Sequence, residues 1–227
     1  MIDIGGGLPV DYKGDESNHI VYQYAKELRE AVPRLFSGEF TVLTEMGRWL
    51  VATAGWFVSR IEYTKLAGGV LVGITHAGGN MFVREVYMRD VWYHPISIYN
   101  EKGEKKTDDL TICNLAGPLC FSGDLIAKEF NLPRFKQGDF MIYHHTAAYS
   151  LGMYSKYNCI AAPPAYLYSF EIKDNDVSIS VKLIKRKETV EEISSFWDNL
   201  FVCFYSFIEF LHDCRKDKRK DELKNFC

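Results

Sequence analysis

The sequence has 227 residues, of which 47% are hydrophobic and 25% are charged. Its 27 Lys and Arg residues nearly balance its 30 Asp and Glu residues, so the formal net charge is −3. This composition excludes an intrinsically disordered chain and a fibrous repeat. A nearly neutral chain also lacks the clustered basic surface of most nucleic-acid-binding proteins, so no nucleic-acid partner is expected.

The cysteines and the least charged stretch indicate where the protein works. The six cysteines form no CxxC pair and no metal-ligand spacing, and no signal peptide precedes them, so we expect a cytoplasmic protein without a disulfide framework. Residues 66–83 contain five glycines, so we expect no membrane-spanning helix and no membrane partner. His144 and His145 are adjacent on a predicted strand and point to opposite faces, so no metal site is expected.

Strand and helix patterns alternate over residues 1–62. Residues 1–7 predict a first short strand that ends in a loop of three glycines, and residues 40–43 predict a second short strand. Apolar residues at helical spacing predict a helix over residues 17–36, and the apolar segment 49–61 is long enough for a buried helix. Two such units predict parallel strands whose following loops lie at one edge of the sheet, where ligands collect.

From residue 63 the pattern changes to short apolar runs divided by glycine, proline and asparagine. With a domain boundary near residue 62, these runs predict an antiparallel, Greek-key-like barrel or sandwich over residues 63–199. Thr189 is the predicted N-cap of a short helix at its end. Residues 200–227 are aromatic and then charged, and predict an amphipathic helix with a solvated tail. The predicted strands cover residues 69–75, 81–87, 96–99, 110–115, 139–144, 165–170 and 177–184.

Two loops of the first region are candidates for ligand binding. Gly5, Gly6 and Gly7 follow a strand, where backbone amides without side chains can wrap a phosphate, although an ordinary tight turn has the same sequence. Residues 45–48 place a glutamate and an arginine at the same edge of the sheet. They can contact a cationic ring and an anionic group, or form a surface salt-bridging turn.

A third candidate is a cysteine in a turn. Cys120 lies between Gly-Pro and Gly-Asp in the segment 117–124. Cysteine commonly packs as a small buried hydrophobic residue, but a turn exposes a thiol enough to give or take a proton. Both interpretations remain open from the residues alone.

The candidate segments, taken together in their order along the chain, resemble the C-terminal half of the pyridoxal-phosphate-dependent decarboxylases of diaminopimelate, ornithine and arginine. Residues 3–7 are similar to the phosphate-binding glycine loop of that family, and residues 45–48 to its Glu-Pro-Gly-Arg motif with methionine in place of proline. Residues 117–124 resemble its Gly-Pro-Leu-Cys-Glu-Ser-Gly-Asp segment, residues 138–158 its Gly-Asp to Tyr-Asn run, and residues 187–189 its Arg-Glu-Thr. The resemblance implies the end of an alanine-racemase-type (β/α) barrel, here its last two βα units, followed by a β-domain.

The resemblance also implies a site and a cofactor. The chain would be an amino-acid decarboxylase, a lyase of lysine or polyamine biosynthesis, with Cys120 as the acid that protonates the product. Glu45 would pair with the pyridine nitrogen of pyridoxal phosphate, which makes the ring an electron sink. Arg84 has the alternative of a solvent-facing strand residue. The phosphate would be bound by Gly5, Gly6, Gly7, Gly47 and Arg48, the amino-acid substrate by Arg48, Arg84, Tyr87 and Tyr149, and Tyr149 would also contact the cofactor.

Departures from the family pattern qualify this assignment. The Schiff-base lysine of the family precedes the glycine loop, where this chain starts, so the chain alone is expected to be inactive. Phe121 replaces a glutamate that contacts the distal end of diaminopimelate, which leaves the substrate open. The family pocket lies between subunits, which implies a homodimer. The alternative is a catalytically inactive interaction or regulatory protein that pairs with a full-length relative.

Overall fold

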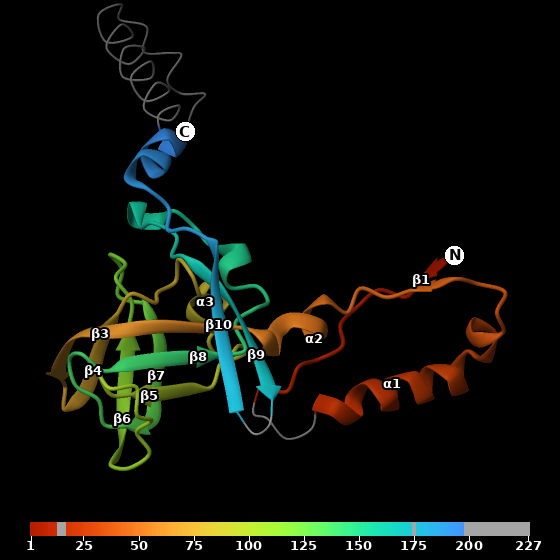
Figure 1. The fold of residues 1–227 in the computed structure, drawn as a ribbon, viewed down its shortest axis with the longest axis horizontal. Coiled ribbons are helices and arrows are strands. Elements are labelled where there is room, and N and C mark those ends of the chain that lie inside the picture. The colour runs from red at the N-terminus through yellow and green to blue at the C-terminus, as the bar shows by residue number, and fades with distance from the viewer. Residues whose placement is uncertain (13–16, 174–175, 198–227) are drawn as a thin grey trace, which may run out of the picture. The chain divides into compact units, whose positions relative to one another are not determined.

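The computed structural model describes residues 1–12, 17–173 and 176–197 (Figure 1). The chain divides into two compact units, residues 1–157 and residues 158–227. The boundary predicted near residue 62 lies inside the strand β3 (Trp56–Ala67), and the predicted tail at residues 200–227 lies outside the described residues. No described helix is both long enough and apolar enough to cross a bilayer.

The first unit begins with two short strands that pair in parallel, as predicted. β1 (Ile2–Asp3) pairs with β2 (Val42–Leu43), and the helix α1 (Ser17–Ala31) lies between them in sequence. α1 is shorter than its predicted span because Pro33 lacks a backbone N–H and restricts the residue before it. The chain continues instead as a 3-10 helix, η1 (Pro33–Phe36).

The helix predicted over residues 49–61 is wrong for its second half. α2 (Gly47–Val51) and a 3-10 turn, η2 (Ala52–Ala54), end at Gly55, whose backbone is extended, and β3 then begins at Trp56. In β3 every second residue faces inward, from Phe57 to Ile61. The sequence hides this alternation because apolar residues such as the exposed Val58 also occupy the outward face.

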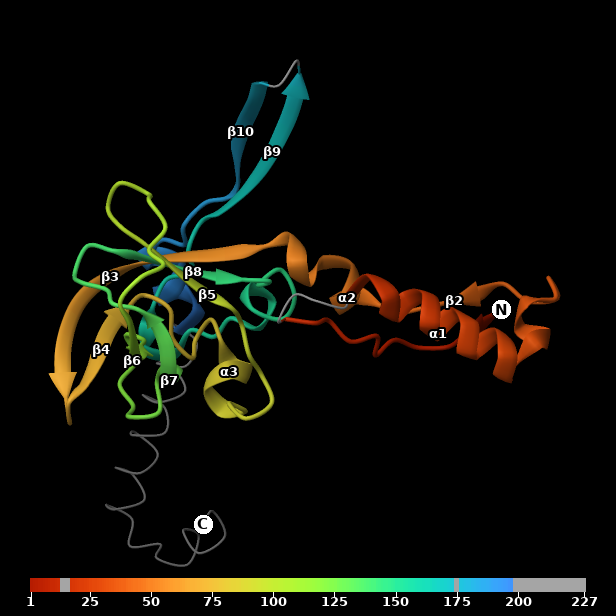
Figure 2. The same ribbon diagram turned by 90° about the horizontal axis from the view of Figure 1, so that it is seen from below.

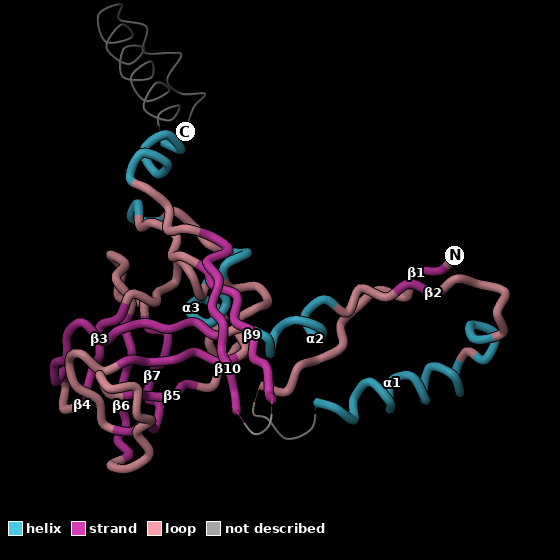
Figure 3. Tube along the Cα trace, in the orientation of Figure 1, coloured by secondary structure: helices cyan, strands magenta, loops and turns pink. Residues whose placement is uncertain are grey.

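The centre of the first unit is a curled six-stranded sheet in the order β5-β8-β3-β4-β6-β7 (Figure 3). Neighbouring strands are antiparallel except β4 and β6, which are parallel, so the expectation of a purely antiparallel sheet is wrong. Parallel neighbours require a crossover, which is the long connection between them. The remaining strands are β4 (Val70–Thr75), β5 (Ile96–Tyr99), β6 (Leu110–Ala116), β7 (Leu125–Pro133) and β8 (Phe140–His144).

The crossover contains a helix where a strand was predicted. Residues 83–87 form α3 (Val83–Tyr87), because the buried Phe82 and Val86 are four residues apart and face the core together. Phe82 stacks on Tyr143 of β8 with ring centroids 4.7 Å apart. The core of the unit comprises Ile61, Ala77, Met81, Phe82, Val86, Ile98, Cys113, Leu115, Ile126, Ala127, Leu132, Phe135, Met141 and Tyr143.

The second unit contains a two-stranded antiparallel sheet (Figure 2). β9 (Ala165–Lys173) and β10 (Asp176–Lys185) match the two strands predicted there. A helix follows from residue 190 and is described to residue 197. Thr189 caps it as predicted: the Glu192 amide donates to Thr189 Oγ1 at 3.3 Å, and the Thr189 amide donates to the Glu192 carboxylate at 2.9 Å. Two further 3-10 turns, η3 (Leu151–Met153) and η4 (Tyr157–Cys159), precede β9.

The core position of β3 leads to a stability prediction. Ile61 is fully buried, so Ile61→Ala should lower the free energy of unfolding by about 2–5 kcal/mol through lost burial and a cavity. Leu66→Ala on the same strand is the matched control, because Leu66 is 71% exposed and its truncation should cost less than about 0.5 kcal/mol. Urea unfolding followed by circular dichroism measures both, and equal effects would contradict the inward register of β3.

Candidate active site

The two predicted loops of the first region lie against each other. The Glu45 amide donates to the Gly5 carbonyl at 2.8 Å, and the Ile4 amide donates to the Leu43 carbonyl at 3.1 Å. A Cβ at Gly6 would lie 2.2 Å from the Glu45 carbonyl oxygen, so only glycine fits there. The parallel pairing of β1 and β2 therefore brings both loops to one place, as the sequence predicts.

The backbone of these loops suits an anion. Gly5 and Gly7 have φ values of +71° and +93°, a region that glycine adopts without strain. α2 begins at Gly47, and Met46 before it provides no side-chain cap. The Gly5 amide donates to the Asp3 carboxylate at 2.8 Å. No described side chain caps α2, so the amides of its first turn can donate to a phosphate oxygen. The Glu45 side chain is exposed beside this backbone.

Arg48 and Arg84 converge on the same two aromatic rings. The Arg48 guanidinium carbon lies 4.4 Å from the ring centroid of Trp92 and 5.1 Å from that of Tyr149. The Arg84 carbon lies 4.6 Å and 4.0 Å from the same centroids. Three predicted site residues are therefore together, and Trp92 is a fourth member that no sequence motif indicated.

The pairing of β3 with β8 explains this convergence. Trp56 at the start of β3 pairs with His144 at the end of β8, which brings the end of the α2 segment to the start of the segment carrying Tyr149. Two further hydrogen bonds extend the contact: the Thr146 amide donates to the Gly55 carbonyl at 2.9 Å, and the Ala147 amide donates to the Ala52 carbonyl at 3.3 Å.

Neither guanidinium has an acidic partner within 4.0 Å among the residues that the structure describes. Two like charges on shared rings repel each other, and an anion between them relieves that repulsion. Guanidinium groups bind carboxylates and phosphates with paired hydrogen bonds. The cluster of Arg48, Arg84, Trp92 and Tyr149, called here the arginine cluster, is therefore suited to a carboxylate or phosphate.

α3 connects the arginine cluster to the loop that carries Cys120. Arg84 lies on this helix, so its alternative as a solvent-facing strand residue is wrong. Three residues later, Tyr87 stacks on Phe121 with centroids 5.8 Å apart and planes 4° apart, and Tyr157 meets Phe121 edge-on at 6.4 Å. Tyr87 thus contacts the neighbour of Cys120 rather than the arginine cluster.

The turn around Cys120 is held by a buried aspartate. The Asp124 carboxylate accepts hydrogen bonds from the amides of Gly79 and Leu119, both at 2.7 Å. Burial raises the pKa of Asp124, and these two hydrogen bonds act against the rise. Cys120 itself is exposed, as expected of a thiol in a turn, and none of the interactions described joins it to the arginine cluster.

Tyr12 is a second residue that the sequence did not indicate. Its ring meets His94 edge-on at 5.1 Å and His145 at 6.1 Å. Burial raises the pKa of its hydroxyl, while the charges of Arg48 and Arg84 act against the rise. It follows the glycine loop in an irregular segment, so no periodicity or motif marks it.

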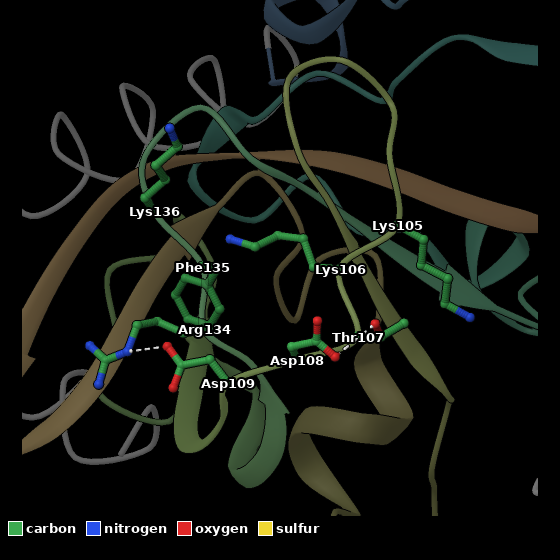
Figure 4. Close-up of a pocket in the computed structure, with 8 residues that line it drawn as sticks. All are labelled: Lys105, Lys106, Thr107, Asp108, Asp109, Arg134, Phe135 and Lys136. Atoms are coloured by element: carbon green, nitrogen blue, oxygen red, sulfur yellow. Dashed lines mark hydrogen bonds and ion pairs between the residues drawn. The ribbon is translucent and has the colours of Figure 1, made fainter.

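A separate pocket of about 450 Å³ contains none of the predicted site residues (Figure 4). Three of its six charged residues form ion pairs within the protein: Arg134 Nε lies 3.1 Å from the Asp109 carboxylate, and Lys106 Nζ lies 2.8 Å from the buried Asp139 carboxylate. Among the described residues no group of three or more His, Cys, Asp or Glu could hold a metal ion. The pocket is lined by Lys105, Lys106, Thr107, Asp108, Asp109, Arg134, Phe135 and Lys136.

Comparison with known families shows to which family the chain belongs. Residues 17–147 match the family described as pyridoxal-dependent decarboxylase, C-terminal sheet domain. The chain belongs to this decarboxylase family. The match includes Glu45, Arg48, Arg84 and Cys120, whereas the glycine loop and Tyr149 lie outside the matched residues.

The chain is also similar to individual relatives. Diaminopimelate decarboxylase of Buchnera aphidicola subsp. Acyrthosiphon pisum is 32% identical over 205 residues, which cover 85% of this chain and 46% of the relative. Diaminopimelate decarboxylase of Escherichia coli K12 is 31% identical over 203 residues, with the same coverage. The chain spans about half the length of the curated relatives that it matches.

Solved structures agree with the sequence comparison. A diaminopimelate decarboxylase crystal structure is 29% identical, with a TM-score of 0.67 over 86% of this chain and 46% of that chain. The Helicobacter pylori enzyme in complex with L-lysine is 26% identical, with a TM-score of 0.66 over 87% and 44% of the two chains. The sheet of the chain is therefore consistent with the C-terminal sheet domain of this family.

The first prediction from this site concerns the contact between its two loops. Gly6→Ala should separate them, because the added Cβ would meet backbone atoms that cannot turn aside. The Glu45 amide, which donates to Gly5, should then exchange with solvent at least about tenfold faster in hydrogen exchange. Gly47→Ala is the control, because its Cβ would have no atom within 4 Å. Unchanged exchange in Gly6→Ala would show that the loops do not touch.

The second prediction concerns the candidate proton donor. Burial raises the pKa of the Cys113 thiol to about 11, whereas Cys120 is exposed. At about pH 8, iodoacetamide should therefore modify Cys120 at least about tenfold faster than Cys113, because the thiolate is the reactive form. Peptide mass mapping gives the two rates separately, and urea should remove the difference. Similar rates in the folded chain would contradict the placement of Cys113 in the core.

Proposed function

We propose that the chain is the C-terminal portion of a pyridoxal-phosphate-dependent decarboxylase acting on diaminopimelate or a closely related amino acid. The observation that carries the proposal is the convergence of Arg48 and Arg84 on Tyr149 and Trp92. Arg48 follows three residues after Glu45, whose amide donates to the Gly5 carbonyl of the glycine loop. Such a site offers separate places for a phosphate and for a carboxylate. The relatives named diaminopimelate decarboxylase support the reaction class.

The residues of the two loops fit pyridoxal phosphate. Gly6 has no room for a side chain, and Gly5 and Gly7 have positive φ values that glycine adopts without strain, so the glycine loop can bind the cofactor phosphate with Gly47 and Arg48. The Gly5 amide, which donates to the Asp3 carboxylate at 2.8 Å, must leave that partner to take part. Glu45 lies at the same edge, where its carboxylate can pair with the pyridine nitrogen. When bound, pyridoxal phosphate withdraws electrons from the substrate carbon as CO2 leaves.

The arginine cluster binds and orients the substrate. Arg48 and Arg84 hold the substrate carboxylate by charge and by paired hydrogen bonds. The rings of Tyr149 and Trp92 fix the planes of both guanidinium groups and exclude water from one side of them. Stacking of this kind limits the positions that each arginine can adopt, which is the requirement for an oriented carboxylate.

Cys120 donates the proton that replaces CO2 on the substrate carbon. Its thiol is exposed on a turn braced by Asp124, so it can reach a site outside its own loop. Because none of the described interactions joins it to the arginine cluster, we propose that it serves the site of a second copy in a cytoplasmic homodimer. Each dimer then has two equivalent sites.

Phe121 bears on which substrate is used. With Tyr87 and Tyr157 it forms an aromatic surface beside Cys120, on which Tyr87 and Tyr157 are exposed. Aromatic faces bind a distal ammonium by cation–π contact or a distal apolar group by burial, and neither requires an acid. We therefore propose that the distal end of the substrate contacts this surface.

The test is decarboxylation by a fusion that supplies the part of the relatives that the chain does not span. The preceding portion of the Escherichia coli enzyme is joined to this chain and assayed with pyridoxal phosphate for CO2 release. The amino acids tested are diaminopimelate, lysine, ornithine and arginine. We expect activity toward at least one of them, and Arg84→Ala should lower kcat/KM by about 100-fold or more through loss of a charged contact.

Arg34→Ala is the control for this test. Arg34 is an exposed arginine that pairs with Glu39 at 2.8 Å, so its loss should leave kcat/KM within about twofold. A folded fusion that binds pyridoxal phosphate but decarboxylates none of the four amino acids would overturn the proposal. That result would favour a non-catalytic interaction role.

A further inference from the structure

We propose that Glu85 and His94 form a positioning pair that holds Arg84 and Trp92 in place for carboxylate binding. Both side chains are buried, with 6% and 4% exposure, and Glu85 Oε1 lies 2.7 Å from His94 Nε2. The other ring nitrogen, Nδ1, lies 2.8 Å from the His144 carbonyl oxygen. The pair is therefore a continuous hydrogen-bonded link from α3 through His94 to the end of β8.

Hydrogen-bond chemistry determines the direction of this link. A carbonyl oxygen only accepts, so His94 Nδ1 carries a hydrogen and donates it to His144. The contact between Nε2 and Oε1 then requires one shared hydrogen, carried either by the ring or by the carboxyl group. In either case the imidazole is held at both nitrogens, which fixes the orientation of its ring.

The pair closes the chain segment that contains Trp92. Glu85 directly follows Arg84 on α3, and His94 lies two residues after Trp92. Residues 88–95 between them form turns and irregular backbone. The Glu85–His94 hydrogen bond thus adds a side-chain link between the helix that carries Arg84 and the segment that carries Trp92. The cation–π distance between these two residues is 4.6 Å.

Other contacts attach the segment 88–95 to β7 and to the turn before it. Arg89 donates to the carbonyls of Gly123 and Leu125 at 3.2 Å, and Tyr93 stacks on Phe130 with centroids 5.6 Å apart. These contacts hold the segment on the protein. Backbone hydrogen bonds also join Trp92 back to Arg84, because the Met88 amide donates to the Arg84 carbonyl at 2.7 Å and the Trp92 amide donates to the Met88 carbonyl at 3.1 Å. The Glu85–His94 pair is the side-chain link that acts beside this backbone path.

The link also reaches the remaining residues of the site. His144 ends β8 and precedes the segment that carries Tyr149, and its amide donates to the Pro95 carbonyl at 3.0 Å. The ring of Tyr12 packs edge-on against His94. One imidazole therefore contacts or adjoins the elements that carry Arg84, Trp92, Tyr149 and Tyr12.

Burial of the Glu85 carboxyl group has a free-energy cost, so packing alone does not explain why a glutamate occupies this position. Glu85 Oε2 is buried without a hydrogen-bond partner in the described structure, as is the hydroxyl of the nearby Tyr143. Removing a carboxylate from water is costly, and proteins with apolar residues of similar size in place of a buried charged pair are commonly as stable or more stable. A role in positioning the arginine cluster accounts for a glutamate at this place.

The test uses the whole chain labelled with 5-fluorotryptophan, without any ligand. Trp92→Phe assigns the Trp92 signal among the four tryptophans in the 19F NMR spectrum. Glu85→Ala should shift the Trp92 signal toward its position in the urea-unfolded chain, because the indole leaves the guanidinium groups. Glu85→Gln should restore it, since the amide of glutamine can still hydrogen-bond to His94.

Glu62→Ala is the matched control, because Glu62 also pairs with a histidine, His76, at 3.1 Å but on the surface. It should leave the Trp92 signal unchanged. If Glu85→Ala does not fold, His94→Phe replaces it, since a phenyl ring suits the surrounding aromatic residues and forms no hydrogen bond. An unchanged Trp92 signal in a folded Glu85→Ala or His94→Phe chain would overturn the inference.

A kinetic measurement extends the inference and rests on the proposed function. In an active fusion, Glu85→Ala should raise KM at least about tenfold with a smaller change in kcat, and Glu85→Gln should recover most of the loss. A fall in kcat with KM unchanged would contradict a positioning role. An inactive fusion would count against the proposed function, while the ligand-free 19F experiment would still decide the inference.

Discussion

The candidate site depends on the pairing of β3 with β8. This pairing places Trp56 opposite His144, so the α2 segment with Arg48 arrives beside the segment with Tyr149. Gly55 makes the approach possible, because a Cβ there would lie 2.8 Å from atoms of Ala147. Without this register, Arg48 of the α2 segment and Tyr149 of the segment after β8 would not lie together.

Electrostatics gives the site its selectivity for anions. Arg48 and Arg84 lie over the same rings and have no acidic partner in the described part of the chain, whereas Arg34 and Arg134 pair with neighbouring carboxylates. Cations without an internal partner remain available to a ligand. Glu85, which directly follows Arg84, hydrogen-bonds to His94 at 2.7 Å and forms no ion pair with either arginine in the described structure, so it does not compete with a ligand for the guanidinium groups.

The sequence interpretation succeeded where motifs consist of consecutive residues. The glycine loop and the turn at Cys120 have the local structures expected of them. The loop expected over residues 45–48 is shorter, because Gly47 and Arg48 already belong to α2. The interpretation failed where periodicity was ambiguous. Residues 56–61 were predicted as helix although they form a strand, because apolar residues on the outward face mask the alternation. Residues 83–87 were predicted as strand although they form a helix, whose buried residues follow a four-residue spacing.

By itself, the sequence determined the family, the order of strand and helix in the first region, and the residue types that a phosphate and a carboxylate require. Only the tertiary structure decided which of these residues meet. Tyr87 contacts Phe121 and not the arginine cluster. Trp92 contacts Arg84, and Tyr12 contacts His94, although no motif marks either residue. The physical reason is that long-range strand register and the burial of His94 place these groups, and neither is encoded in a short run of residues.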